Sequence, residues 1–117
     1  MTIAEIAKDF TELLQQGDHH GAAEKYNANE IVSYEAMEGP MAVARGKEAL
    51  KQKGQWWQEN HEVHGGSVEG PYVNGDQFAV RFTFDITPKA TGQRVTMDEV
   101  GLYTVKNGKI AEERFYY

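Results

Sequence analysis

Three glutamates, Glu35, Glu99 and Glu113, lie in stretches of the sequence that have the composition of β-strands. A carboxyl group held in an apolar cavity has its charged form disfavoured, so its pKa rises towards a value that is useful for proton transfer. We therefore predict that Glu35 is a general base and that Glu99 is a second catalytic group. Glu113 is expected on the same face of the sheet, as a ligand-binding residue.

Each of these carboxyl groups also has a simpler interpretation. Glu35 could be a hydrated side chain at the mouth of a cavity, and Glu99 or Glu113 could form an ion pair with Arg94 or Arg114. If two or three of the carboxyl groups share one cavity, their repulsion keeps one of them protonated. A protonated carboxyl group can donate a hydrogen bond to a ligand.

Two histidines, His61 and His64, can exchange protons near neutral pH. Residues three apart on a strand point to opposite faces, so this spacing does not suit a metal ion. One of the two can face a cavity and act with Glu35, and we take His64 as that residue. A bulge at Gly65-Gly66 would reverse the choice.

Large apolar side chains are expected to line the same cavity. Trp56 and Trp57 are neighbours, so they point in different directions on a helix, and we take Trp57 as the one that lines the cavity. The predicted ligand-binding residues are Trp57, Phe82, Tyr103, Glu113 and Phe115. The sequence has no glycine-rich phosphate loop, no Gly-x-Ser-x-Gly and no His-Glu-x-x-His, and we expect no metal and no cofactor.

The last forty residues position most of these groups. Gln77–Ile86 alternates apolar and polar residues with the period of a strand that buries one face. Gln93–Val105 is rich in β-branched and aromatic residues, and Ile110–Tyr117 follows the hairpin signal Asn107-Gly108. These segments predict a three-stranded antiparallel meander, in which Pro88 ends the first strand.

The upstream residues must cover the apolar face of this sheet. Thr2–Gln16 has an apolar stripe at helical spacing and begins with the capping pair Thr2 and Glu5. We expect two more helices, Asp18–Tyr26 and Gly46–Asn60, and two more strands, Ile31–Met37 and His61–Ser67. This order predicts an α+β cone, in which three N-terminal helices pack on a strongly curved, mostly antiparallel sheet. Such a shape encloses a cavity.

Composition limits the classes of partner. We expect one domain, residues 1–117. The chain has no cysteine and no basic-then-apolar leader, and no stretch approaches the roughly 18 apolar residues of a membrane span. The net charge of −6 disfavours nucleic acid and membrane surfaces as partners. We expect a cytoplasmic protein that binds a small molecule.

Four segments resemble the nuclear transport factor 2-like superfamily, and within it the SnoaL-like and ketosteroid-isomerase-like proteins. They are Phe10–Asp18, Tyr26–Glu35, Arg45–Leu50 and Val105–Ile110, and together the resemblance extends over nearly the whole chain. It implies the conical α+β fold. It also implies a homodimer formed through the outer face of the sheet, where Arg81, Thr83 and Asp85 are expected.

In ketosteroid isomerases the general base is a carboxylate late in the first strand, and Glu35 has the matching position. The tyrosine of the isomerase oxyanion hole is on the first helix, and Phe10 has its position here. A protonated carboxylic acid on the penultimate strand of that family corresponds to Asp98 or Glu99, and strand parity favours Glu99 as the inward residue. Phe10 cannot donate a hydrogen bond, which argues against steroid isomerisation itself.

Two hypotheses about function follow. In the first, the cavity binds an apolar or cyclic molecule, and the protein is a cofactor-independent isomerase, cyclase or dehydratase. Glu35 then removes a proton next to a carbonyl group, and Glu99 or a histidine binds the enolate. In the second, the domain is a non-catalytic ligand-binding or dimerisation module. A filled cavity with an ion-paired Glu35 would favour the second.

Overall fold

The chain forms three helices and six strands, and the computed structural model describes residues 1–117. In chain order the elements are α1 (Ile3–Gln15), α2 (His19–Tyr26), β1 (Asn27–Tyr34), β2 (Val43–Arg45), α3 (Lys47–Asn60), β3 (His61–Asn74), β4 (Gln77–Pro88), β5 (Val95–Lys106) and β6 (Lys109–Tyr116). None of the helices combines the length and the hydropathy that a membrane crossing requires.

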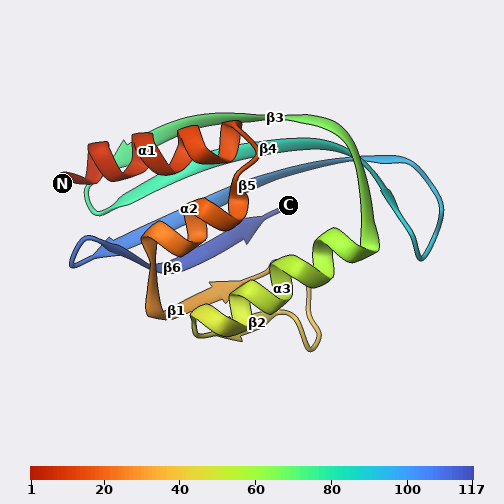
Figure 1. Cartoon of the computed structure of the whole chain (residues 1–117), viewed down its shortest axis with the longest axis horizontal. Coiled ribbons are helices and arrows are strands. Elements are labelled where there is room, and N and C mark those ends of the chain that lie inside the picture. The colour runs from red at the N-terminus through yellow and green to blue at the C-terminus, as the bar shows by residue number, and fades with distance from the viewer.

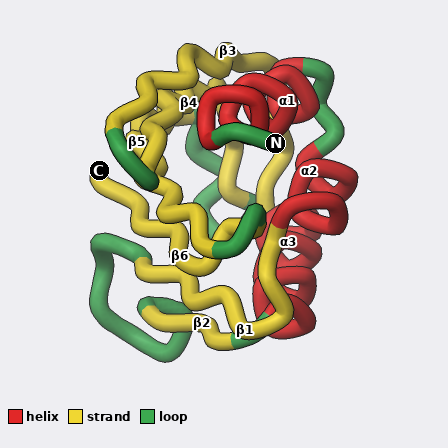
Figure 2. Tube along the Cα trace, turned by 90° about the vertical axis from the view of Figure 1, so that its left-hand side faces the viewer, coloured by secondary structure: helices red, strands yellow, loops and turns green.

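The six strands form one sheet in the order β2-β1-β6-β5-β4-β3. The pairing of β1 with β6 is parallel, and all other pairings are antiparallel. The sheet curls around the helices without closing, so that α1, α2 and α3 lie on its concave side (Figures 1 and 2). The predicted α+β architecture, with three helices on a curved and mostly antiparallel sheet, is confirmed.

The helix α1 begins and packs as its sequence predicts. The backbone N–H of Thr2 donates to the Glu5 carboxylate at 2.9 Å, and the N–H of Glu5 donates to the Thr2 hydroxyl at 3.1 Å. These two bonds satisfy backbone donors that the first turn leaves free. The apolar stripe of the helix is buried and joins the core of the domain, which contains Ile6, Ala7, Phe10, Leu14, Tyr26, Ile31, Phe78, Val80, Phe82, Tyr103 and Ile110.

The meander β4–β5–β6 follows the alternation of the sequence. Phe78, Val80, Phe82 and Ile86 are buried on the concave face, where Phe84 is half-buried. The turn between β5 and β6 has positive φ at Asn107 (53°) and Gly108 (76°), which an asparagine and a glycine adopt more readily than other residues.

Three strands differ from the sequence-based expectation. β1 begins at Asn27 rather than Ile31 and ends at Tyr34, so Glu35 immediately follows the strand. β2 was not predicted, because three residues show no alternation. β3 continues past Gly70-Pro71 to Asn74, with irregular pairing at that point. It can do so because β3 is an edge strand, where a proline need not remove a ladder hydrogen bond.

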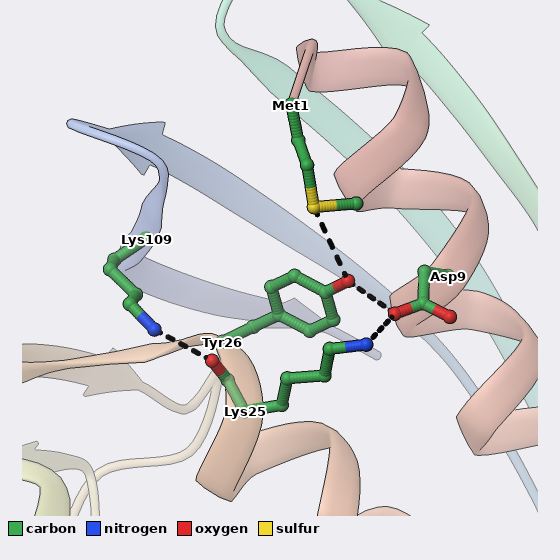
Figure 3. A network of polar contacts seen from close by, with 5 residues as sticks. All are labelled: Met1, Asp9, Lys25, Tyr26 and Lys109. Atoms are coloured by element: carbon green, nitrogen blue, oxygen red, sulfur yellow. Dashed lines mark hydrogen bonds and ion pairs between the residues drawn. The ribbon is translucent and has the colours of Figure 1, made fainter.

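A polar network joins α1 to α2 (Figure 3). The buried Tyr26 donates a hydrogen bond from its hydroxyl to Asp9, and the Lys25 ammonium lies 2.6 Å from the same carboxylate. On the other side, Lys109 of β6 donates to the backbone carbonyl of Lys25 at 2.8 Å. The network therefore connects both helices to the last strand of the sheet.

Candidate functional site

A large open cavity lies between the concave face of the sheet and α3. Its volume is about 1630 Å³, and its lining includes the end of α1, the inner side of α3 and strands β3 to β6. The residues of its wall that carry the argument below are Phe10, Glu35, Lys53, Trp57, His61, Phe82, Phe84, Glu99, Tyr103, Glu113, Phe115 and Tyr117.

Strand register places the polar groups of the cavity side by side. Ser33 of β1 lies opposite Glu113 of β6, which in turn lies opposite Tyr103 of β5. Gly101 lies two residues before Tyr103, and Glu99 two residues before Gly101, so all three face the cavity from one strand. Three neighbouring strands thus contribute polar side chains to one region of the concave face.

Glu35 is held in an ion pair. Its Oε1 lies 2.5 Å from Nζ of Lys53, and each of the two side chains is 17% exposed. Lys53 Nζ also donates to Ser33 Oγ at 3.0 Å, while the Tyr117 hydroxyl donates to Glu35 Oε2 at 3.0 Å. α3 places Lys53 here because Lys53 lies one turn after the buried Leu50 and one turn before Trp57.

Glu113 accepts a hydrogen bond from the Ser33 hydroxyl. Burial raises the pKa of the Glu113 carboxyl, and the negative charge of Glu35 adds to this effect. The hydrogen bond from Ser33 and the positive charge of Lys53 act in the opposite direction. The net shift is upward, so protonation of Glu113 is easier than for a solvated glutamate.

Glu99 has no ion-pair partner and is half-buried. Burial raises the pKa of its carboxyl to about 7, and the neighbouring negative charges of Glu35 and Glu113 contribute to the rise against the charge of Lys53. The two arginines that could have neutralised these carboxyl groups have other partners, since Arg94 pairs with Asp85 and Arg114 with Glu112. Near neutral pH, Glu99 therefore populates both its acid and its base form.

Tyr103 supplies a buried phenol at the cavity wall. Its side chain is 3% exposed, and burial, together with the carboxylates around it, raises the pKa of the hydroxyl well above its ordinary value. A Cβ atom at Gly101 would lie 3.0 Å from this hydroxyl and 3.1 Å from the Phe115 ring. Because Gly101 has no side chain, there is space beside it for the Tyr103 hydroxyl.

Aromatic rings surround these polar groups. Trp57 stacks on His61 with 4.4 Å between ring centroids and 13° between planes, and it lies 6.4 Å from the ring of Phe84. Deeper in the cavity, Phe10 packs on Tyr103 with 4.9 Å between centroids. These surfaces suit a flat or cyclic apolar ligand.

His64 lies outside the cavity, in contrast to the position predicted for it. A register shift between Val63 and Gly65 marks a bulge at this residue, and the His64 ring contacts Thr87 Oγ1 at 2.7 Å. His61 lines the cavity in its place. The pair Gly65-Gly66 indicated a bulge from the sequence, but it did not indicate which residue is bulged or which histidine then faces the cavity.

Seven of the eight predicted site residues line the cavity, namely Glu35, Trp57, Phe82, Glu99, Tyr103, Glu113 and Phe115. Sequence reasoning missed the ammonium group of Lys53, which pairs with Glu35. It also missed Tyr117, which resembles an ordinary packing residue. No group of three or more His, Cys, Asp or Glu side chains is arranged to hold a metal ion.

Comparisons with known proteins agree with this fold. The model of the SnoaL-like domain family matches residues 1–117. A crystal structure from Mesorhizobium loti, of a protein provisionally named a SnoaL-like polyketide cyclase with "carbohydrate phosphatase" in brackets, is 87% identical, covers 100% of both chains and has a TM-score of 0.99. No protein of curated function matches the chain.

More distant structures share the architecture. An NTF2-like (nuclear transport factor 2-like) protein from Burkholderia xenovorans is 27% identical over 97% of this chain and 87% of that one, with a TM-score of 0.73. A protein from Pseudomonas putida, provisionally named a polyketide cyclase, is 19% identical over 100% of this chain and 92% of that one, with a TM-score of 0.71, and is similar in fold alone. Because the family model spans residues 1–117, the chain belongs to the SnoaL-like family.

Proposed function

We propose that the protein binds a small cyclic carbonyl compound in this cavity and transfers a proton at the carbon next to the carbonyl group. The observation that carries the proposal is the grouping of Glu35, Glu99, Glu113 and Lys53 within an aromatic-lined cavity of about 1630 Å³. Proton transfer of this kind needs a carboxyl group in a poorly solvated site and a donor for the oxygen that gains charge.

Glu99 is the group that we assign to proton transfer. A general base works best when its pKa is close to the working pH, and the pKa of about 7 meets this condition. Glu35 was the first candidate from the sequence, but both oxygens of its carboxylate already have partners, Lys53 and Tyr117. Glu35 takes the role of holding Lys53.

The relative with 87% identity supports the same class of substrate. Its provisional name is that of a polyketide cyclase, and polyketide chains are rich in carbonyl groups flanked by acidic C–H bonds. Phe10 lines the cavity but cannot donate a hydrogen bond to the carbonyl oxygen of a ligand, so another residue must supply that donor. Tyr103, which packs directly on Phe10, has a hydroxyl group at the wall of the cavity.

The second candidate is a non-catalytic ligand-binding module. The ion pair between Glu35 and Lys53 favours it, because that pair removes the carboxylate expected to act as the base. Two observations favour catalysis instead. The cavity is open rather than filled, and Glu99 keeps a carboxyl group without an ion-pair partner.

Hydrogen–deuterium exchange at the α-carbon of cyclic ketones and 1,3-diketones, followed by proton NMR in D₂O, tests the proposal. We expect the wild-type protein to accelerate exchange and the Glu99→Gln variant to lose about 100-fold or more of that acceleration. The matched control is Glu112→Gln, which changes a glutamate on the opposite face of β6.

Ligand-induced changes in the fluorescence of Trp56 and Trp57, which both line the cavity, follow binding separately. Binding with equal exchange in wild type and Glu99→Gln would establish the binding-module alternative. Failure of the whole ketone panel to bind or exchange would overturn both candidates.

A further inference from the structure

Lys53 is the cation closest to the carboxyl groups of the cavity. Its charge acts on Glu99 and Glu113, and its ammonium bonds Glu35 directly. The other basic residues of the lining, Arg45, Lys47 and Lys51, lie on β2 and on the first turns of α3. Of these, Lys47 donates to the backbone carbonyl of Glu24 at 2.8 Å, whereas Arg45 and Lys51 are exposed.

The donors of the Lys53 ammonium are not all used by the protein. A lysine has three N–H donors and no acceptor. One bonds Glu35 Oε1 at 2.5 Å and a second bonds Ser33 Oγ at 3.0 Å. The third is left for a ligand, in a cavity where the Phe115 ring lies 5.6 Å from the ammonium.

The position of the ammonium is also fixed before any ligand enters. Ser33 lies on β1, and Glu35 directly follows the same strand. Tyr117 holds the second oxygen of Glu35 at 3.0 Å. A donor that is already oriented costs no reorganisation when charge develops on a ligand, which is the condition for stabilising an oxyanion.

We propose that Lys53 is the oxyanion-binding residue of this cavity, and that the site therefore selects ligands whose oxygen is anionic or becomes so, namely enolisable ketones and acidic phenols. The inference rests on the proposed function of the same site. It replaces the donor expected from the sequence, a protonated Glu99 or a histidine, by an ammonium on α3.

The proposed step conserves charge and atoms. The Glu99 carboxylate takes the proton of the C–H bond next to the carbonyl group, and the electron pair of that bond forms a carbon–carbon double bond. The π electrons of the carbonyl move to its oxygen, which becomes an enolate oxygen bound to the third N–H of Lys53. Glu99, now neutral, returns the proton to carbon, and the negative charge returns from the ligand oxygen to Glu99.

A phenol that changes colour on ionisation tests this inference without any catalytic turnover. 4-Nitrophenol presents an aromatic ring and an oxygen that is neutral or anionic according to pH, and its absorption reports which form is bound. We expect wild-type protein to bind the phenolate at least tenfold more tightly than the phenol, which lowers the apparent pKa of the bound ligand by one unit or more.

Variants of the ion pair separate the contributions. Lys53→Met should abolish the preference for the phenolate, and Lys53→Arg should retain part of it. Glu35→Gln should increase the preference, because the ammonium then lacks its neutralising partner. Lys8→Met, at an exposed position on α1 outside the cavity, should leave the preference unchanged.

Lys53→Met alone leaves Glu35 partly buried and unpaired, which can impair folding. The double variant Lys53→Met with Glu35→Gln removes both charges and gives the same readout. If the double variant keeps the phenolate preference, or if wild type binds without any preference, the role of Lys53 in binding the oxyanion is overturned. The proposed function would still stand in that case. Absence of binding by both 4-nitrophenol and the ketone panel would overturn the proposed function with it.

Discussion

Glu35 and Glu99 illustrate how partners, rather than residue type, set the chemistry of a side chain. Glu35 is neutralised by Lys53 and receives a hydrogen bond from Tyr117. Glu99 shares the same cavity but has no such partner, so burial and neighbouring negative charge favour its protonated form. The two glutamates are therefore suited to different roles, the first as a fixed counter-ion and the second as an exchangeable acid and base.

The raised pKa of Glu99 predicts a pH dependence of stability. The native carboxyl has a pKa of about 7 and the unfolded one has its ordinary value of 4.5, so between these values the native state binds more protons. Stability then falls as pH rises from 4.5 to 7, by an upper limit of about 3 kcal/mol from this group, and the loss is complete above pH 7. Below pH 4.5 both states are protonated, so the contribution is fully present and stability no longer changes with pH through this group.

Glu99→Gln removes this contribution. Relative to wild type, the variant should gain more free energy of unfolding at pH 8 than at pH 4, by up to about 3 kcal/mol. Urea denaturation at both pH values measures the difference, with Glu112→Gln as control. The same difference at both pH values would show that the carboxyl group titrates normally. Glu113, whose pKa is also raised, leaves some pH dependence of the same sign in the variant.

The sequence predicts the acidic residues of the cavity better than their partners. Glu99, Tyr103, Glu113 and Phe115 share a face because strand alternation has a fixed period of two. The contact of the Lys53 ammonium with Glu35 could not be predicted, because it depends on how α3 packs against the end of β1. His64 was misplaced for a related reason, since a single bulged residue reverses the side to which a strand points.

At the scale of elements, the hydroxyl of the buried Tyr26 joins α2 to Asp9 of α1, beside the ion pair of Lys25 with the same carboxylate. Tyr26 is 3% exposed, and its ring lies 6.2 Å from that of Phe10. Hydrogen bonds from Lys25 and Tyr26 lower the pKa of the Asp9 carboxyl, so the contact is between a neutral donor and a charged acceptor. Such bonds are stronger than those between neutral groups.

Tyr26→Phe should therefore cost about 1 kcal/mol of the free energy of unfolding, because it removes one hydrogen bond from the Asp9 carboxylate, which keeps its ion pair with Lys25. Chemical denaturation at neutral pH measures the loss. The control is Tyr72→Phe on β3, where the side chain is 61% exposed and the change should stay within about 0.5 kcal/mol. Equal losses in the two variants would mean that the hydroxyl of Tyr26 does not join the helices.

Elements with a strong period were predicted together with the faces that they bury, whereas the short strand β2 was not predicted. α1 and the meander β4–β6 have apolar residues at regular spacing, so their faces and approximate limits follow from the sequence. β2 has three residues, and its pairing with β1 is a consequence of the sheet rather than of its own composition. β1 begins at Asn27 because its pairing with Ile110 of β6 overrides the low strand preference of asparagine.

At the scale of the molecule, the outer face of the sheet combines charged pairs with exposed apolar side chains. Arg81 lies 2.8 Å from Asp98, and Arg94 lies 2.5 Å from Asp85. Beside them, Val100 is 37% exposed and lies opposite Tyr116, which is 52% exposed. We propose, as the sequence suggested, that a second copy of the chain packs on this face.

Sedimentation velocity should then give the mass of a dimer, and Val100→Asp should give a monomer, because a carboxylate would be buried at the centre of the interface. Val73→Asp, which changes a valine of β3 that is 42% exposed and lies opposite Phe78 of the concave face, is the matched control and should remain dimeric. A monomeric wild type at micromolar concentration would contradict the proposal.

The parallel pairing of β1 with β6 has a consequence for protein synthesis. Residues 27–34 find their main strand partner in residues 109–116, which leave the ribosome some eighty residues later. Until then the growing chain must carry the apolar face of β1, including Ile31, without the strand that covers its edge. The strand of this sheet that comes last in the chain thus completes it, and a nascent chain that stalls before β6 would be a client for chaperones.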